Sequence, residues 1–125
     1  MENKKYKLTS ESIEVKGKTL YRIEALKDFG EIKKGDKGGF IESENNLAHE
    51  GDAWVSGYAQ VYGNARVYDD ARVCGNSRVY GTARVTDDAC VCGTARVYDN
   101  DWVYDHALGV WKRSNKKNKS WQSTK

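Results

Sequence analysis

Hydrophobic and polar positions repeat with a six-residue period from Gly51 to Val110. The fifth position of each six-residue unit is valine in nine of ten copies, and the third is alanine in all but two. Residues two apart on a strand point to the same side, so each unit predicts a short strand with inward valine and alanine. Glycine, aspartate and asparagine are common at the first two positions, where the chain turns. This pattern is typical of a coiled, parallel β-solenoid.

A second period of eighteen residues is superimposed on the first. Cys74 and Cys92 are separated by this interval, as are Tyr62, Tyr80 and Tyr98. Eighteen residues equal three units, so one coil has three faces. We expect an all-β triangular prism of about three coils, each rising by about 4.8 Å.

The spacing of an aliphatic residue and a small residue four positions later, as in Val61 and Ala65, resembles that of hexapeptide-repeat proteins. That resemblance implies a left-handed parallel β-helix. Together with segments 21–30 and 33–47, the units also resemble a family of small phage and prophage hexapeptide-repeat proteins. Members of that family are often labelled transferases by analogy.

The repeats divide the chain into three expected regions. Residues 1–46 are predicted to form an N-terminal β cap, because the open end of a solenoid must be covered. Residues 47–111 form the β-helix, and residues 112–125 form a basic tail that we expect to be disordered when free.

Within the cap, alternation on both sides of Lys16 and Gly17 predicts a β-hairpin. The glycine-rich segment 35–39 lacks the spacing of a phosphate-binding loop and is interpreted as a plain turn. His49 lies six residues before Val55, so it is predicted to take the place of a core valine.

Composition changes this picture only in part. The formal net charge of +3 is too small by itself to indicate nucleic-acid binding. The chain has no apolar run long enough for a membrane span and no apolar segment near its start that is typical of a signal peptide. An odd number of cysteines without a secretion signal predicts reduced thiols and a cytoplasmic location, which would be the host cytoplasm for a phage protein. We predict no cofactor and no metal.

The residues on either side of each valine point outward, and two of the three outer faces carry arginine and tyrosine. These types are enriched among the residues that dominate binding energy. Solvated strand surface, a protein interface and an anionic ligand site are all open interpretations. The predicted partner-binding residues are Arg78, Tyr80, Arg96, Tyr98, Tyr62, Arg66, Arg84, Tyr68 and Tyr104.

The remaining face is small and apolar, so we expect it to pack against another subunit or a returning part of the chain. A narrow core of valine and alanine also favours association, so we expect a homo-trimer or homodimer; the hexapeptide resemblance implies a trimer. The residues of this predicted oligomer patch are Cys74, Cys92, Leu108 and Val110.

One corner of the prism is acidic, because aspartates recur there at the coil spacing. Stacked carboxylates repel one another, so something must offset their charge. We favour pairing with Arg66, Arg72 and Arg84 and capping of the turns by the aspartates over a bound Ca²⁺ ion. The residues concerned are Asp69, Asp70, Asp87, Asp88 and Asp105.

The basic tail has two interpretations: a solubilising segment, or an electrostatic contact with nucleic acid, another polyanion or an acidic protein face. Trp121 could stack on such a partner. Its charged residues are Lys112, Arg113, Lys116, Lys117 and Lys119, followed by the terminal lysine.

A non-enzymatic binding or scaffold protein is the function we expect. The phage resemblance implies a host protein or nucleoprotein as partner, with inhibition of a host defence complex as one role. The alternative is an acyltransferase-like enzyme. Hexapeptide acyltransferases use a histidine base beside a loop extruded from a coil, whereas this chain has only His49 and His106 and no interruption of the units.

Overall fold

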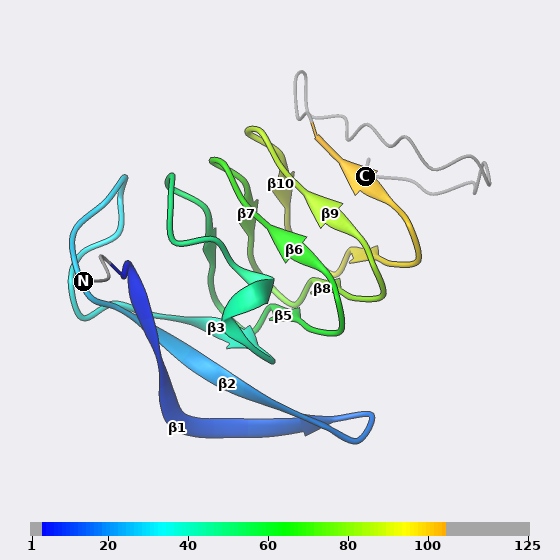
Figure 1. Ribbon diagram of the computed structural model, residues 1–125, viewed down its shortest axis with the longest axis horizontal. Helices are drawn as coiled ribbons and strands as arrows, with labels where there is room; N and C mark the ends of the chain where they lie inside the picture. The colour runs from blue at the N-terminus through cyan, green and yellow to red at the C-terminus, as the bar shows by residue number, and fades with distance from the viewer. Residues whose placement is uncertain (1–3, 105–125) are drawn as a thin grey trace.

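The computed structural model describes residues 4–104, which form strands and one short 3₁₀ helix (Figure 1). No helix among these residues is long and apolar enough to span a bilayer. The elements are β1 (Tyr6–Val15), β2 (Lys18–Ala25), β3 (Lys37–Ile41), the 3₁₀ helix η1 (Glu44–Asn46), β4 (Trp54–Val55), β5 (Gln60–Val61), β6 (Arg66–Val67), β7 (Arg72–Val73), β8 (Arg78–Val79), β9 (Arg84–Val85), β10 (Cys90–Val91), β11 (Arg96–Val97) and β12 (Trp102–Val103).

The two-residue strands stack as the six-residue period predicts. Successive coils consist of β4–β6, β7–β9 and β10–β12, and strands three apart along the chain pair in parallel. Val61, Val79 and Val97 lie in register and are fully buried, as are the alanines at the third position of most units. The β-solenoid and its inward valine columns are therefore confirmed.

The corners explain why so few residue types occupy the first position of a unit. Asp69 and Asp87 have φ values of 62° and 56°, in the left-handed region, and glycine takes the equivalent place in most other units. Aspartate, asparagine and glycine tolerate this conformation better than other residues. The choice between aspartate and glycine is therefore a backbone requirement of the turn.

An additional, partial coil precedes the regular ones, so the solenoid is longer than the predicted three coils. Ile41 pairs with Val61 and Leu47 pairs with Val67, twenty residues apart instead of eighteen. Two extra residues thus lie between Leu47 and Val55. The prediction that His49 replaces a core valine is wrong, because this insertion places Leu47 in the core column.

The predicted hairpin is confirmed as β1 and β2, joined by Lys16 and Gly17 with φ values of 52° and 82°. Both residues have positive φ, as the tight turn of a two-residue hairpin requires. Strand β2 then pairs with β3 in antiparallel fashion, and β3 pairs with β5 in parallel. The hairpin is thereby continuous with one sheet of the solenoid (Figure 1).

The carbonyl groups at the start of the solenoid would lack partners without the N-terminal region. The N–H group of Phe40 donates to Ala59 O at 2.9 Å. The side-chain amide of Asn46 donates to Gly63 O at 3.2 Å and to Ala65 O at 2.8 Å. The cap therefore closes the first coil by hydrogen bonding, because a buried carbonyl without a partner is costly, and by apolar packing, since Ile23 and Leu47 join the valine and alanine core.

The glycine-rich segment is only partly a turn. Gly35 has a φ of 95° and ends the turn, whereas Gly38 and Gly39 belong to β3 and are buried. A Cβ atom on Gly38 would lie 2.5 Å from Val55 O and 2.6 Å from Ile23 Cγ1. Glycine is needed there because β3 runs against the neighbouring backbone.

Candidate binding faces

Three outer faces follow from the three columns of strands, and we name them by their side chains. The tyrosine face belongs to β5, β8 and β11, the aromatic–arginine face to β6, β9 and β12, and the cysteine face to β4, β7 and β10. The outward residues of the tyrosine face are Gln60, Tyr62, Arg78, Tyr80, Arg96 and Tyr98. Those of the aromatic–arginine face are Arg66, Tyr68, Arg84, Thr86, Trp102 and Tyr104. Those of the cysteine face are Trp54, Ser56, Arg72, Cys74, Cys90 and Cys92.

The tyrosine face carries a stack of three parallel rings. The ring centroids of Tyr62 and Tyr80 are 5.2 Å apart, and those of Tyr80 and Tyr98 are 5.5 Å apart. This spacing follows from the distance between coils, so the regular sequence period directly generates the stack.

The hairpin covers the first part of this stack. Leu20 packs with Phe40 and Tyr62 in a small apolar cluster, and the Tyr62 side chain is only 4% exposed. The Lys16 ammonium lies 5.9 Å from the centroid of the Tyr80 ring. Burial raises the pKa of the Tyr62 hydroxyl. The first half of this predicted partner site is therefore occupied by the protein's own hairpin.

The aromatic–arginine face is more open. Arg66 and Arg84 lie opposite each other on β6 and β9, and both are exposed. Neither forms an ion pair with a carboxylate in the described part of the chain. On the next coil, Trp102 is 42% exposed and Tyr104 is 36% exposed, with their rings edge to face at 6.1 Å.

A shallow cleft adjoins the start of this face. Its volume is about 410 Å³, and its lining includes Asn45, Ala48, Tyr68 and both arginines. The cleft forms because the partial first coil is irregular beside β6. The face therefore combines a hollow at one end with exposed aromatic rings at the other.

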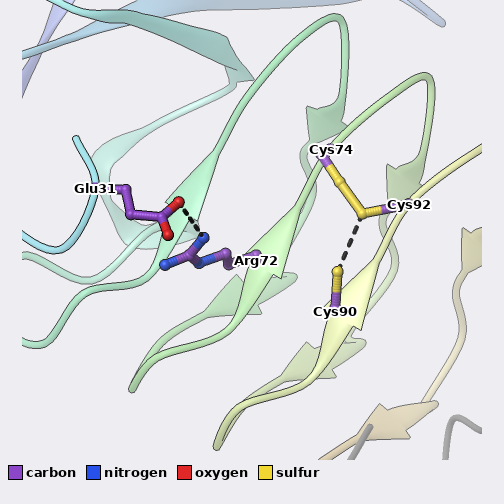
Figure 2. The surroundings of a disulfide bond; sticks show 5 residues. All are labelled: Glu31, Arg72, Cys74, Cys90 and Cys92. Carbon is purple, nitrogen blue, oxygen red and sulfur yellow. Dashed lines mark hydrogen bonds and ion pairs between the residues drawn. A yellow bond between two sulfur atoms is a disulfide. The ribbon is translucent and has the colours of Figure 1, made fainter. Parts of the chain in front are cut away.

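The cysteine face contains a disulfide bond between Cys74 and Cys92, one coil apart (Figure 2). The sulfur of Cys90 lies 3.1 Å from that of Cys92. The expectation of three reduced thiols is therefore wrong for the bonded pair. Parallel pairing of β7 with β10 places Cys74 and Cys92 opposite each other, with their Cα atoms 4.6 Å apart, within the range that a disulfide spans.

A returning loop covers the other end of this face. The Phe29 ring packs edge to face against Trp54 at 5.3 Å, and Trp54 is buried. Glu31 from the same loop forms an ion pair with Arg72 at 3.5 Å (Figure 2). Leu108 and Val110, the other members of the predicted oligomer patch, lie outside the described residues.

The acidic corner is held by hydrogen bonds between coils. The Asp69 carboxylate accepts a hydrogen bond from Thr86 Oγ1 at 2.5 Å and from the Asp87 N–H at 3.3 Å. Asp70 Oδ1 accepts from the Asp52 N–H at 3.2 Å. The expected capping by aspartate is therefore present for Asp69 and Asp70, although each of these two caps a turn of the neighbouring coil and not its own.

The predicted arginine pairing of that corner is wrong. None of the four described corner aspartates forms an ion pair with an arginine in residues 4–104, and Arg72 pairs with Glu31 instead. The fifth aspartate of the predicted corner, Asp105, lies outside the described residues, as do His106 and the basic tail with Lys112, Arg113, Lys116, Lys117 and Lys119.

Sequence reasoning missed a polar cluster at the start of the solenoid. The Lys5 side chain is buried beneath the first coil, and its ammonium group donates to Gly51 O at 3.1 Å and to Ala53 O at 2.8 Å. Tyr6 stacks on His49 with centroids 4.2 Å apart. The available signal was the irregular spacing before Val55, which indicates that the first coil differs from the others.

Burial and ion pairing shift the pKa values in this cluster. Burial lowers the pKa of Lys5 to about 8, against the attraction of Asp52 and other nearby carboxylates. The Tyr6 hydroxyl donates to Leu47 O at 2.5 Å, and burial raises its pKa. His49 and Lys4 hold the pKa of Glu44 below its usual range, while burial opposes them.

Comparison with known protein families supports the repeat architecture. Residues 59–75 match a family model described as the YdcK beta solenoid repeat. No curated protein sequence matches the chain. The matched residues extend from β5 into the second regular coil, so this match and the stacked parallel strands agree that the protein is a β-solenoid repeat protein.

Proposed function

We propose that the protein is a non-enzymatic binding scaffold and that the aromatic–arginine face carries its partner site. The observation that supports this most is the exposure of Trp102 and Tyr104 beside Arg84 on one strand column. Tryptophan, tyrosine and arginine are the residue types that contribute most to binding at protein interfaces.

The charges on this face favour an acidic partner. Arg66 and Arg84 are directly opposite on adjacent parallel strands, and like charges in that position destabilise a sheet. A partner carboxylate between them would relieve this repulsion and form charge-assisted hydrogen bonds. Trp102 and Tyr104 would supply apolar contact beside it. The partner is therefore a protein with an acidic surface that fits the aromatic–arginine face.

The resemblance to small phage and prophage proteins adds a narrower hypothesis. In that setting the partner is a host protein or nucleoprotein, and binding inhibits a host defence complex. This hypothesis rests on the resemblance alone, whereas the choice of face rests on the exposed side chains.

The experiment compares two matched double variants as affinity baits. Arg84→Ala with Trp102→Ala removes an arginine and an aromatic residue from the aromatic–arginine face, and Arg96→Ala with Tyr98→Ala removes an arginine and an aromatic residue from the tyrosine face. Each bait is incubated with nuclease-treated and untreated host lysate. The protein that the parent captures is then purified and titrated against all three chains.

We expect the first variant to bind the partner about 10- to 1,000-fold more weakly, which corresponds to about 1.4–4 kcal/mol, and the second to bind like the parent. Equal binding by parent and first variant would contradict the choice of face. Capture that disappears after nuclease treatment would show that nucleic acid is the ligand. A separate calorimetric titration with coenzyme A tests the enzymatic alternative, and saturable binding there would contradict a purely scaffolding role.

A further inference from the structure

Three sulfur atoms lie together on the cysteine face, and the binding-scaffold function does not use them. The Sγ atoms of Cys74, Cys90 and Cys92 are all within 4.8 Å of one another (Figure 2). All three cysteines are half-buried. They come from two adjacent strands, so the rigid ladder of the solenoid holds their backbone positions.

We propose that the reduced chain binds one soft, thiophilic cation through the thiolates of Cys74, Cys90 and Cys92. Cysteine thiolates select soft ions such as Zn²⁺ and Cu⁺ over hard ions such as Mg²⁺ and Ca²⁺. A metal–sulfur bond of about 2.3 Å places two sulfurs on one ion roughly 4 Å apart. In the oxidised chain the sulfurs of Cys74 and Cys92 are bonded to each other, and that of Cys90 lies 3.1 Å from that of Cys92. After reduction, side-chain rotations can bring the three sulfurs to the spacing that one ion requires.

The strand register makes this cluster a preorganised chelate. Val73 pairs with Val91, so the outward residues that follow them, Cys74 and Cys92, face each other across the ladder. Val91 is fully buried between Cys90 and Cys92, and its inward packing fixes both cysteines on the outer side. Little conformational entropy remains to be lost when an ion binds.

The surroundings fit a site with three protein ligands. Among residues 4–104, no histidine, aspartate or glutamate belongs to the sulfur cluster. A cleft of about 330 Å³ adjoins Cys74 and Cys90 and is also lined by Trp54 and Ser56. Copper(I) needs no further ligand there, whereas Zn²⁺ would take a water molecule from the cleft as its fourth.

Arg72 offsets the negative charge of such a site. Arg72 pairs with Cys90 across β7 and β10, so its charge acts on that sulfur, although the guanidinium group is turned toward Glu31, with which it forms an ion pair (Figure 2). Three thiolates carry more negative charge than either ion neutralises. A nearby fixed cation therefore stabilises the loaded site.

Metal binding requires the disulfide to be opened first. Reduction of the Cys74–Cys92 bond takes two electrons and two protons, which a dithiol supplies while it closes to its own disulfide. The cation then displaces the protons of three thiols. Oxidised chain should therefore bind no ion at this site, so occupancy depends on the redox state of the protein.

The test uses the full chain, reduced with a phosphine under argon. Zn²⁺ alone and Cu⁺ alone are the probes, and the affinity for each ion is measured by competition with a coloured chelator. Cobalt(II) serves as a spectroscopic probe, because thiolate ligands give it charge-transfer absorption in the near ultraviolet. Cys90→Ser removes one ligand but keeps the pair that forms the disulfide. Ser56→Ala is the control, because it changes the same cleft without removing a thiol.

We expect one ion per reduced parent chain for at least one probe, and none for the oxidised chain. Loss of an outer-shell partner weakens metal binding by about 10- to 100-fold. Cys90→Ser removes a direct ligand, so it should weaken binding by at least this factor, while Ser56→Ala should bind like the parent. Equal affinity of Cys90→Ser and parent would overturn the proposal, as would reduced parent that binds neither ion. Where the parent binds Zn²⁺, its cobalt spectrum is an independent test that needs no variant, because absence of a charge-transfer band would then refute thiolate ligation of that ion.

Discussion

Replacement of Lys5 by methionine tests how the solenoid end is closed. The variant keeps the length of the side chain and its apolar stem, but it removes the ammonium group that donates to Gly51 O and Ala53 O. Both carbonyls then lose a buried partner. Because hydrogen bonds to a charged group contribute about 1.5–3 kcal/mol, we expect the variant to be less stable at pH 7 by a similar or smaller amount.

The dependence of stability on pH gives the sharper result, and its sign follows from the lowered pKa. Lys5 is only 1% exposed, and burial lowers its pKa from 10.5 to about 8. Between these values the unfolded chain holds a proton on Lys5 that the folded chain has released. The unfolded state therefore binds more protons, so the free energy of unfolding rises with pH in this window. Below pH 8 both states are protonated, and the slope vanishes.

The magnitude is set by the size of the shift. Each pKa unit corresponds to about 1.4 kcal/mol, and most of the window lies between pH 8 and pH 10. We expect parent chain to gain about 2 kcal/mol over this range relative to Lys5→Met. The range stops at pH 10 because the raised pKa of Tyr6 acts in the opposite direction above that value, where the folded state holds the extra proton.

The assay is urea unfolding followed by circular dichroism at pH 7, 8, 9 and 10 for parent and Lys5→Met. Both chains carry the same cysteines, so thiol chemistry at alkaline pH cancels in the difference. A difference that stays flat from pH 8 to pH 10 would show that the Lys5 charge remains solvated. A difference of opposite sign would show that Asp52, Asp70 and Glu50 stabilise the charged form more than burial disfavours it.

Three further predictions concern the core, the cap and the association of chains. Val79→Asp places an unpaired charge between Val61 and Val97 and should abolish cooperative unfolding in a calorimetric scan. The control Arg78→Gln changes the outward neighbour and should unfold like the parent. A normal melting transition for Val79→Asp would contradict the predicted prism. Gly38→Ala should lower the free energy of unfolding, measured with urea, by about 1–3 kcal/mol, because the added Cβ meets the backbone of Val55. Thr94→Ala changes an exposed residue and serves as the unaffected control. Equal urea midpoints for Gly38→Ala and the parent would show that β3 can move away. The narrow valine and alanine core favours a homodimer or homo-trimer, and light scattering that shows a monomer at tens of micromolar would refute this.

The features that follow from the six- and eighteen-residue periods could be predicted, and those that do not follow from these periods could not. Two superimposed periods fix the valine columns and the three outer faces, because every coil repeats the same geometry. The same periods cannot show what lies on those faces. The hairpin alternates regularly, but its pattern does not reveal that Leu20 packs against Tyr62. The eighteen-residue spacing of Cys74 and Cys92 did reveal their proximity, and only the assumed redox state prevented prediction of the bond.

The sequence predicted a cap, but the polar cluster around Lys5 was missed for a different physical reason. A search for hydrophobic periodicity finds surfaces that bury apolar area, whereas the exposed end of a β-solenoid presents a row of carbonyl oxygens around a small apolar centre. Donor groups such as the Lys5 ammonium and the Asn46 amide satisfy those carbonyls, while apolar cap residues such as Ile23 cover the centre. A polar segment that precedes a repeat array is therefore no sign of a free tail. Here Lys5 supplies a donor beside β4, which among the described strands has none paired on its outer side, and the two-residue insertion lies directly before that strand.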